Sequence, residues 1–238
     1  MRLLVTRPED DAALQAAALT SRGHEVFLAP LLQIEMERPP LDLENVQAVI
    51  VTSRNALRAL ERHPQKDALL QLPVFAVGEA TARAANGMGF REIAVGPGNG
   101  AGLADVIRDS AEPVRGALLH LSGQDLAFDL AAALSDYELR RAVMYRAVPA
   151  EDLPGKIPQL VREGKLDGAI LMSPRTAATF VSLLRGHDLL EPAARLICYC
   201  LSEAVAEAAS PLGADLRVPG KPREEDILAL IDAEAASL

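Results

Sequence analysis

One stretch decides the fold, Val46-Gln47-Ala48-Val49-Ile50-Val51-Thr52-Ser53-Arg54-Asn55-Ala56. An apolar, β-branched run leads through a threonine and a serine, which are favoured at helix starts, into a segment of helical character. The same order returns later as Leu166-Asp167-Gly168-Ala169-Ile170-Leu171-Met172-Ser173-Pro174-Arg175-Thr176-Ala177. Strand, serine and helix start coincide in both copies. The chain therefore contains a repeated strand-helix unit, which is typical of an α/β protein.

The repeat extends in both directions from these two strands. Downstream, residues 77–85 correspond to residues 200–208, and a further strand and a closing helix follow in both copies. Upstream, residues 3–6 correspond to residues 118–122, and a predicted helix follows each of these strands. We therefore predict two lobes of one α/β design that are related by duplication.

Short β-type runs alternate along the chain with Ala- and Leu-rich stretches of helical period, which indicates a parallel sheet built from βαβ units. Strands are predicted near residues 2–6, 24–28, 46–52, 73–77, 92–95, 117–121, 138–144, 167–172, 195–200 and 215–218. Helices are predicted over residues 10–21, 54–61, 79–88, 102–111, 125–135, 176–184, 203–212 and 224–236.

The periodic pattern lapses at two proline-containing stretches, residues 33–40 and 146–154. Because proline resists helix and central strand, both are predicted to be linkers between lobes. One lobe is then the middle segment, residues 38–146, and the other combines residues 1–35 with residues 148–238. Such a molecule has a cleft between its lobes.

Composition excludes several classes of function. The chain has 238 residues and a net charge of −9, from 24 Lys and Arg against 33 Asp and Glu, so we expect no nucleic-acid partner. Its apolar runs are far shorter than the ~20 residues that cross a bilayer. The N-terminus lacks the apolar core of a signal peptide. We expect a cytoplasmic protein that does not bind a membrane.

Motifs of common catalytic and metal sites are missing. His24, His63, His120 and His187 lack metal-ligand spacing, and neither a nucleophile elbow nor a phosphate-binding P-loop occurs. ATP hydrolysis, zinc hydrolysis and triad acyl transfer are therefore disfavoured, and no metal site is predicted. Cys198 and Cys200 alternate with Tyr199 in an apolar segment, so they are expected to be buried strand thiols.

The candidate site residues lie where predicted strands end and helices begin, which is the edge where parallel sheets bind ligands. They are Thr6, Arg7, Thr52, Ser53, Arg54, Gly78, Glu79, Ser122, Gly123, Ser173, Pro174, Arg175 and Ser202. Helix-start N–H groups, hydroxyls and arginines can bind anions together. Ser and Thr at such places are also ordinary helix caps, so capping alone is the alternative.

Two further features stand out. Tyr145 directly follows the predicted strand 138–144, where the chain leaves the middle lobe, and is either a packed rim residue or a catalytic phenol. The glycine-rich run 96–102 follows a strand and precedes a helix. It is either a nucleotide-binding loop, although Pro97 interrupts the usual fingerprint, or a flexible loop.

The order of these pieces resembles the uroporphyrinogen-III synthase family over essentially the whole chain. The resemblance is carried by residues 3–8, 30–31, 50–56, 74–82, 98–99, 121–123, 143–146 and 170–176. It implies two flavodoxin-like lobes, each with a doubly wound parallel sheet, joined by two extended linkers.

The resemblance also implies an enzyme, a cyclising hydro-lyase that needs no cofactor. Its substrate is the linear tetrapyrrole hydroxymethylbilane, which carries eight carboxylates. The product is uroporphyrinogen III, formed with inversion of ring D and loss of water through a spiro-pyrrolenine. The tyrosine of the family falls on Tyr145, which would assist departure of the hydroxyl, and Ser53, Ser173 and Ser202 fall on or near the loops that hold carboxylates.

Three expectations accompany this assignment. We expect a monomer that acts in porphyrin and haem biosynthesis, with a transient hand-over of substrate from hydroxymethylbilane synthase. The alternative is a non-catalytic, two-lobe regulatory paralogue that binds an anion or a tetrapyrrole. A flavin- or nucleotide-binding protein of flavodoxin type is a third, weaker interpretation.

Overall fold

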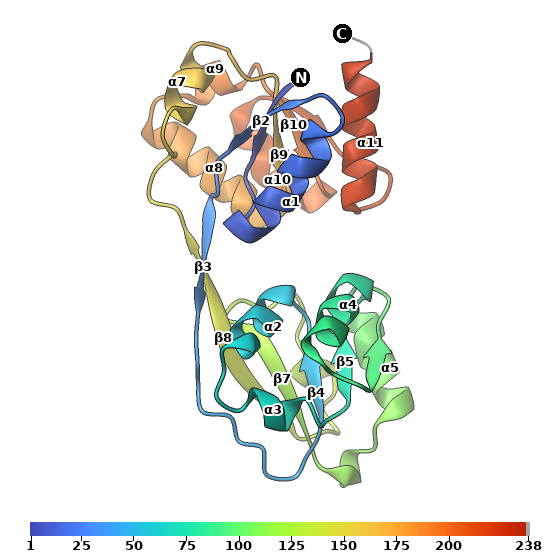
Figure 1. Cartoon of the computed structure of the whole chain (residues 1–238). Coiled ribbons are helices and arrows are strands. Elements are labelled where there is room, and N and C mark those ends of the chain that lie inside the picture. Colours follow the sequence, from blue (N-terminus) through green and yellow to red (C-terminus); the bar gives the residue numbers. More distant parts are fainter. Residues whose placement is uncertain (237–238) are drawn as a thin grey trace. The chain divides into compact units, whose positions relative to one another are not determined.

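The computed structural model describes residues 1–236 and divides the chain into two compact units (Figure 1). Unit 1 consists of Met1–Gln33 together with the chain from Val148 onward, and unit 2 consists of Ile34–Ala147. Unit 1 is therefore discontinuous in sequence, whereas unit 2 is a single segment. No helix within residues 1–236 is both long enough and apolar enough to cross a membrane.

Unit 1 contains a five-stranded parallel sheet. In spatial order its strands are β11 (Asp215–Arg217), β10 (Ile197–Cys200), β9 (Gly168–Leu171), β1 (Arg2–Val5) and β2 (Glu25–Leu28). The central strands β1, β9 and β10 are apolar on both faces, as expected of a parallel sheet that is covered by helices on both sides.

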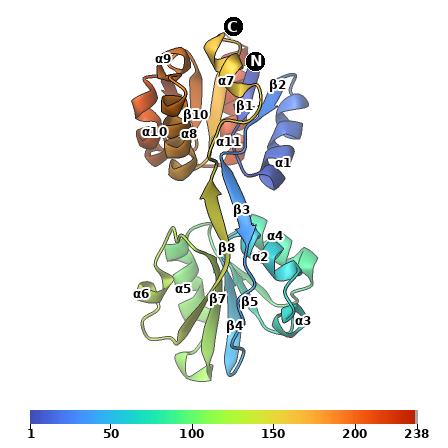
Figure 2. The ribbon, with the colours of Figure 1, turned by 90° about the vertical axis from the view of Figure 1, so that its left-hand side faces the viewer.

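Alternate residues of the strands separate the core of unit 1 into two layers. Leu4 packs with one set of helices, α7 (Ile157–Arg162), α8 (Pro174–Gly186), α9 (Leu190–Ala193), α10 (Glu203–Ala209) and the 3-10 turn η2 (Ser210–Leu212). Leu3 and Val5 pack with α1 (Glu9–Thr20) and α11 (Glu224–Ala235) on the opposite face. Figure 1 shows α8 on one side of this sheet and α11 on the other, and Figure 2 shows β1 between β10 and β2.

Unit 2 contains a six-stranded sheet whose inner pairings are parallel. Its spatial order is β3 (Leu32–Met36), β8 (Leu139–Pro149), β7 (Ala117–Gly123), β4 (Val46–Val51), β5 (Val74–Ala76) and β6 (Ile93–Val95). Val49 and Val51 face α2 (Arg54–Glu61), α3 (Lys66–Leu69) and α4 (Glu79–Met88). Ala48 and Ile50 face α5 (Gly100–Ser110) and α6 (Leu130–Ala133), and the 3-10 turn η1 (Pro113–Arg115) follows α5.

The prediction of an α/β fold with parallel sheets is confirmed, and every predicted strand is present. The helix predicted over residues 125–135 is wrong for most of its length, since only α6 forms there. Asp129 Oδ1 accepts a hydrogen bond from the Ala132 N–H, which caps the helix and delays its start. Residues 124–129 stay irregular and exposed.

The two proline-containing stretches are more ordered than an interrupted pattern predicts. Residues 33–36 belong to β3, an edge strand, and β8 continues as far as Pro149. The prolines at positions 39 and 40 lie beyond the end of β3, so they are compatible with this edge strand. The helices α3, α7 and α9 were not predicted, because segments of four to six residues carry too little periodicity to be detected.

The prediction of buried strand thiols is confirmed. Cys198 and Cys200 are free, buried on β10 and part of the core that contains Phe180. Burial raises the pKa of the Cys198 thiol to about 12 and that of Cys200 to about 11. Both are therefore uncharged packing residues.

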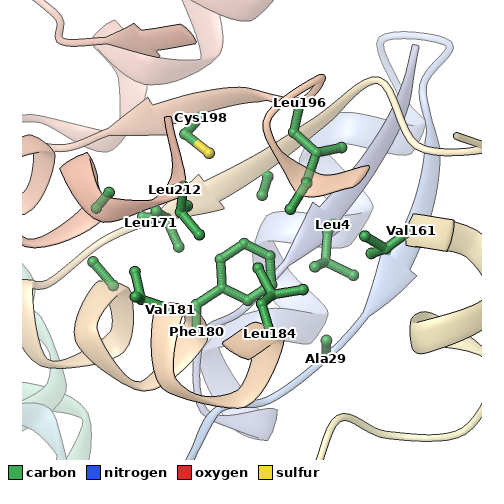
Figure 3. Close-up of a cluster of buried hydrophobic side chains, with 14 of the residues drawn as sticks. Leu4, Ala29, Val161, Leu171, Phe180, Val181, Leu184, Leu196, Cys198 and Leu212 are labelled. Carbon is green, nitrogen blue, oxygen red and sulfur yellow. The ribbon is translucent and has the colours of Figure 1, made fainter. Parts of the chain in front are cut away.

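Phe180 on α8 lies among Leu4, Leu171, Leu184 and other apolar side chains and is fully buried (Figure 3). We expect Phe180→Ala to lower the free energy of unfolding by about 3–5 kcal/mol, since it leaves a large cavity. Urea denaturation followed by far-UV circular dichroism measures this loss. Leu14→Ala, at a side chain that is 64% exposed, is the control and should change stability by less than about 0.5 kcal/mol. Equal losses in both variants would contradict this core.

Candidate functional site

A pocket of about 230 Å³ opens at the carboxyl ends of the strands of unit 2. Its walls come from the residues that follow β4 and β5, from β7 and β8, and from residues 98–100, 125–128 and 130. Strand ends in a parallel sheet lead into helix N-termini, so backbone N–H groups and polar side chains meet at this edge. The pocket therefore lies where the topology concentrates ligand-binding groups.

Two helix starts contribute polar groups to this pocket. Ser53 caps α2, because its Oγ accepts a hydrogen bond of 3.1 Å from the Asn55 N–H. Asn99 caps α5 in the same way, accepting a hydrogen bond of 2.8 Å from the Gly102 N–H. Both capping residues line the pocket. The partial positive charge of a helix N-terminus favours an anionic ligand beside them.

The glycine-rich run forms a wall of the pocket. A Cβ atom on Gly78 would lie 3.0 Å from Gly98 Cα, so the two backbones are in close contact. The Gly98 N–H donates a hydrogen bond of 2.7 Å to Val77 O, and Gly98 has a φ of +99° that favours glycine. These contacts hold the loop against the start of α4.

Part of the pocket wall is apolar. Leu126 and Phe128 belong to the irregular loop before α6, and both are exposed although they line the pocket. The Phe128 ring lies against Gly100, where an added Cβ atom would be only 2.5 Å from Phe128 Cγ. The pocket thus combines an aromatic surface with hydrogen-bond donors, a combination suited to a ring that carries acidic side chains.

Tyr145 is held in the pocket by its neighbour on β7. Gly123 and Tyr145 are partners across β7 and β8, and a Cβ atom on Gly123 would lie 2.6 Å from Tyr145 Cζ and 2.8 Å from its Oη. Only glycine leaves room for the ring at this place. Within residues 1–236 the Tyr145 hydroxyl makes no hydrogen bond to the protein, so it can donate to a ligand.

Arg141 stabilises the end of β7. Its Nε donates a hydrogen bond of 2.9 Å to Ser122 Oγ, and its Nη2 donates to Gly123 O at 2.7 Å and to Gln124 O at 2.6 Å. Ser122 is fully buried, and its own hydroxyl donates to Gly123 O. The guanidinium therefore fixes the backbone on which the Tyr145 ring rests.

His120 is the buried titratable group of the site. It lies on β7, its Nε2 is 3.1 Å from Thr52 Oγ1, and its side chain reaches the pocket although only 2% of its surface is exposed. Burial, and secondly the positive charge of Arg141, lower the pKa of His120 from 6.5 to about 4. The imidazole is therefore neutral at pH 7.

The candidate residues of unit 2 have different surroundings. Thr52, Ser53, Gly123 and Tyr145 line the pocket. Of the other predicted residues of this unit, Arg54 is the first residue of α2 and Gly78 is the N-cap of α4. Glu79 Oε2 lies 4.0 Å from Arg83 Nη1, and Ser122 is buried. The Ser122 hydroxyl is used inside the protein, so among the predicted residues of this unit the side chains that line the pocket are those of Thr52, Ser53 and Tyr145.

The remaining candidates belong to unit 1, at the carboxyl ends of β1, β9 and β10. Thr6 is buried and donates a hydrogen bond of 2.6 Å to Ile170 O. Arg7 forms ion pairs with Asp11 at 3.2 Å and Glu224 at 2.7 Å. The others occupy helix starts, with Ser173, Pro174 and Arg175 at the start of α8 and Ser202 as the N-cap of α10.

His120, Asn99 and Phe128 are among the pocket residues that sequence reasoning missed. His120 carried a usable signal, since it is the one polar side chain in the apolar run Ala117-Leu118-Leu119-His120-Leu121. Asn99 could have been recognised as a helix cap. Phe128 was hidden by the prediction of a helix through its loop. Residues 1–236 contain no cluster of three or more His, Cys, Asp or Glu that could hold a metal ion.

Comparison with known families identifies the chain's relatives. The family model described as "Uroporphyrinogen-III synthase HemD" matches residues 14–229. The chain belongs to the uroporphyrinogen-III synthase family. The family assignment made from the sequence is thereby confirmed, and with it the prediction of an enzyme, a cyclising lyase of tetrapyrrole synthesis that serves porphyrin and haem biosynthesis.

Solved structures of uroporphyrinogen-III synthases share the fold. The enzyme from Helicobacter pylori superposes with a TM-score of 0.69 at 19% identity, covering 98% of this chain and 100% of the other. A mutant of the Thermus thermophilus enzyme gives a TM-score of 0.60 at 18% identity, covering 100% of this chain and 98% of the other. No curated protein sequence matches the chain.

His120 makes stability depend on pH in a definite direction. Between its folded pKa of about 4 and its ordinary value of 6.5, the unfolded chain binds a proton here that the folded chain does not. The free energy of unfolding should therefore fall as the pH is lowered from 6.5 to 4. In His120→Gln this component is absent, so the loss over the same range should be smaller by as much as about 3 kcal/mol. Urea denaturation at pH 7, 6, 5 and 4 measures the difference, and parallel profiles would rule out a neutral buried imidazole.

Proposed function

We propose that the pocket of unit 2 is where this chain acts on hydroxymethylbilane, with Tyr145 as its catalytic residue. The observation that carries the proposal is the Tyr145 phenol, which is seated on Gly123 at the pocket and has no hydrogen-bond partner within residues 1–236. A phenol in this position can donate a proton or hydrogen bond to a leaving hydroxyl group.

The proposed reaction begins at the hydroxymethyl group of the substrate. Its C–O bond breaks while the Tyr145 Oη–H group protonates the departing oxygen, which leaves as water, and loss of the pyrrole N–H proton then restores the phenol. The pyrrole electrons form an azafulvene in the same step. Ring D then attacks through its substituted carbon to give the spiro-pyrrolenine, and fragmentation followed by reclosure inverts the ring. Protein groups alone take part, so the proposal includes no cofactor.

Binding of the substrate carboxylates is proposed for the helix starts. The caps Ser53 and Asn99 and the hydroxyl of Thr52 supply polar groups to the pocket, and Phe128 supplies an apolar surface for a pyrrole ring. Ser173, Arg175 and Ser202 are proposed to bind other carboxylates at the helix starts of unit 1. Because backbone N–H groups share in this binding, single side-chain deletions at the caps are expected to have mild effects.

The strand orders support the proposal that the two units are flavodoxin-like and related by duplication. Numbered along the chain, the strands of unit 1 have the order 2-1-3-4-5 across the sheet. Unit 2 has the same order when numbering starts at β7, with β3 as an additional edge strand. Each unit then combines the first part of one repeat with the second part of the other. A cytoplasmic monomer that receives substrate from hydroxymethylbilane synthase completes the proposal.

The function is tested by supplying fresh hydroxymethylbilane, oxidising the products and resolving the type I and type III uroporphyrin isomers by chromatography. Type III product above the spontaneous type I background supports the enzyme. We expect Tyr145→Phe to lower the rate of type III formation by about 100-fold, since general acid assistance is lost, with an unchanged circular dichroism spectrum. Wild-type turnover in this variant would exclude Tyr145 from the mechanism. Type I product alone from the folded wild-type protein would favour the non-catalytic paralogue.

The contact between the Tyr145 ring and Gly123 gives a second test. Gly123→Ala places a methyl group where the ring lies, so the ring must move, and we expect turnover to fall by roughly 100-fold because the phenol is misplaced. Gly87→Ala is the matched control in the same unit, since nothing lies within 4 Å of its added Cβ. Isomer analysis and circular dichroism are applied to both variants. Equal turnover in the two variants would show that the position of the ring does not matter.

A further inference from the structure

The mechanism proposed above does not use His120, although it is a buried titratable side chain that reaches the pocket. Its Nε2 lies 3.1 Å from Thr52 Oγ1, and Thr52 lines the same pocket directly before the cap of α2. Burying a polar ring in a largely apolar strand costs desolvation free energy. Any role of His120 in the pocket therefore involves its contact with Thr52.

A neutral imidazole has two forms with opposite consequences for Thr52. If Nε2 lacks a proton, the Thr52 hydroxyl donates to it, and only oxygen lone pairs remain for a ligand. If Nε2 carries the proton, Thr52 Oγ1 accepts from the ring and the hydroxyl hydrogen is left for a ligand. The Thr52 hydroxyl can donate to an anionic ligand only in the second form.

The surroundings of the pair favour a donor at Thr52. The hydroxyl adjoins the N-terminus of α2, where an anion is stabilised. The nearby positive charge of Arg141 and the burial of the ring keep the imidazole from becoming a cation. A carboxylate in the pocket would therefore meet a neutral chain of two hydrogen bonds that ends in the Thr52 O–H group.

We propose that His120 is a positioning residue, whose Nε2–H group donates to Thr52 Oγ1 and so directs the Thr52 hydroxyl hydrogen toward a carboxylate of the substrate. The inference rests on the proposed function for the identity of the anion. The hydrogen-bond direction within the pair does not depend on it. His120 acts only through Thr52, so removing either side chain should remove the same interaction.

A double-mutant cycle in the isomer assay tests this dependence. We expect Thr52→Val and His120→Leu each to lower kcat/KM by about tenfold, chiefly through KM, which corresponds to one hydrogen bond to a charged group. The double variant should also lose about tenfold, because the second change has nothing left to remove. A loss of about 100-fold in the double variant, or no loss in His120→Leu, would overturn the proposal.

Two further variants separate positioning from packing. His120→Gln keeps an N–H donor in reach of Thr52 and should recover most of the loss seen with leucine. A loss in His120→Gln as large as that in Thr52→Val would overturn the proposal. His63→Leu is the matched control, because His63 is also buried in unit 2 but its Nε2 is 2.9 Å from Pro39 O, away from the pocket. It should lower stability without changing KM.

A spectroscopic measurement keeps the inference separate from the proposed reaction. With histidine labelled by ¹⁵N, nuclear magnetic resonance reports the tautomer of each ring, and the His120 signals are those missing in His120→Gln. We expect the neutral Nε2–H form between pH 6 and pH 8 in the free protein. A protonated ring or the Nδ1–H form would overturn the inference even if the enzyme is active. Absence of type III product with the expected tautomer would count against the reaction and leave the hydrogen-bond direction intact.

Discussion

Burial of both faces of a parallel sheet is the constraint on which the rest of the molecule depends. The strands must be apolar on both sides, and helices must cover both layers, as Leu4 with α8 and Leu3 with α11 illustrate in unit 1. Each strand then has to return through a helix that begins at the same edge. Polar helix starts gather there for reasons of topology, before any ligand is considered. The pocket of unit 2 uses this edge.

Close packing then gives the pocket its chemistry. Gly123 leaves room for the Tyr145 ring, Gly78 and Gly98 bring two backbone segments into contact, and Arg141 ties the end of β7 through two carbonyl oxygens. None of these groups carries out chemistry itself. They hold a phenol, a threonine hydroxyl and two capped helix starts on rigid elements, which is how a site with few side chains can still orient a flexible polyanion.

The parts predictable from sequence are those that rest on periodicity and repetition. The strands at residues 46–51 and 168–171 could be predicted because both are largely apolar and both are followed by a serine and a helix start. Thr52, Ser53 and Gly123 could be placed at the pocket because strand ends in a parallel sheet share an edge. Tyr145 lines the pocket too, but the prediction that it directly follows its strand is wrong, since β8 continues past it to Pro149. Ser122 and Thr6 look the same in sequence, yet their hydroxyls are used inside the protein. Such a difference depends on which partners the tertiary structure supplies, as does the loop that keeps Phe128 outside a helix.

The discontinuity of unit 1 bears on how the chain is made. β1 is a central strand, placed between β2 and β9, and β9 begins only at Gly168. During synthesis from the N-terminus, Ile34–Ala147 leaves the ribosome as a complete segment and can fold first. The opening residues must wait with one edge of β1 and the face that carries Leu4 uncovered until the last third of the chain emerges. Translation of the final segment is therefore the step that ends the exposure of this strand to aggregation and to chaperones.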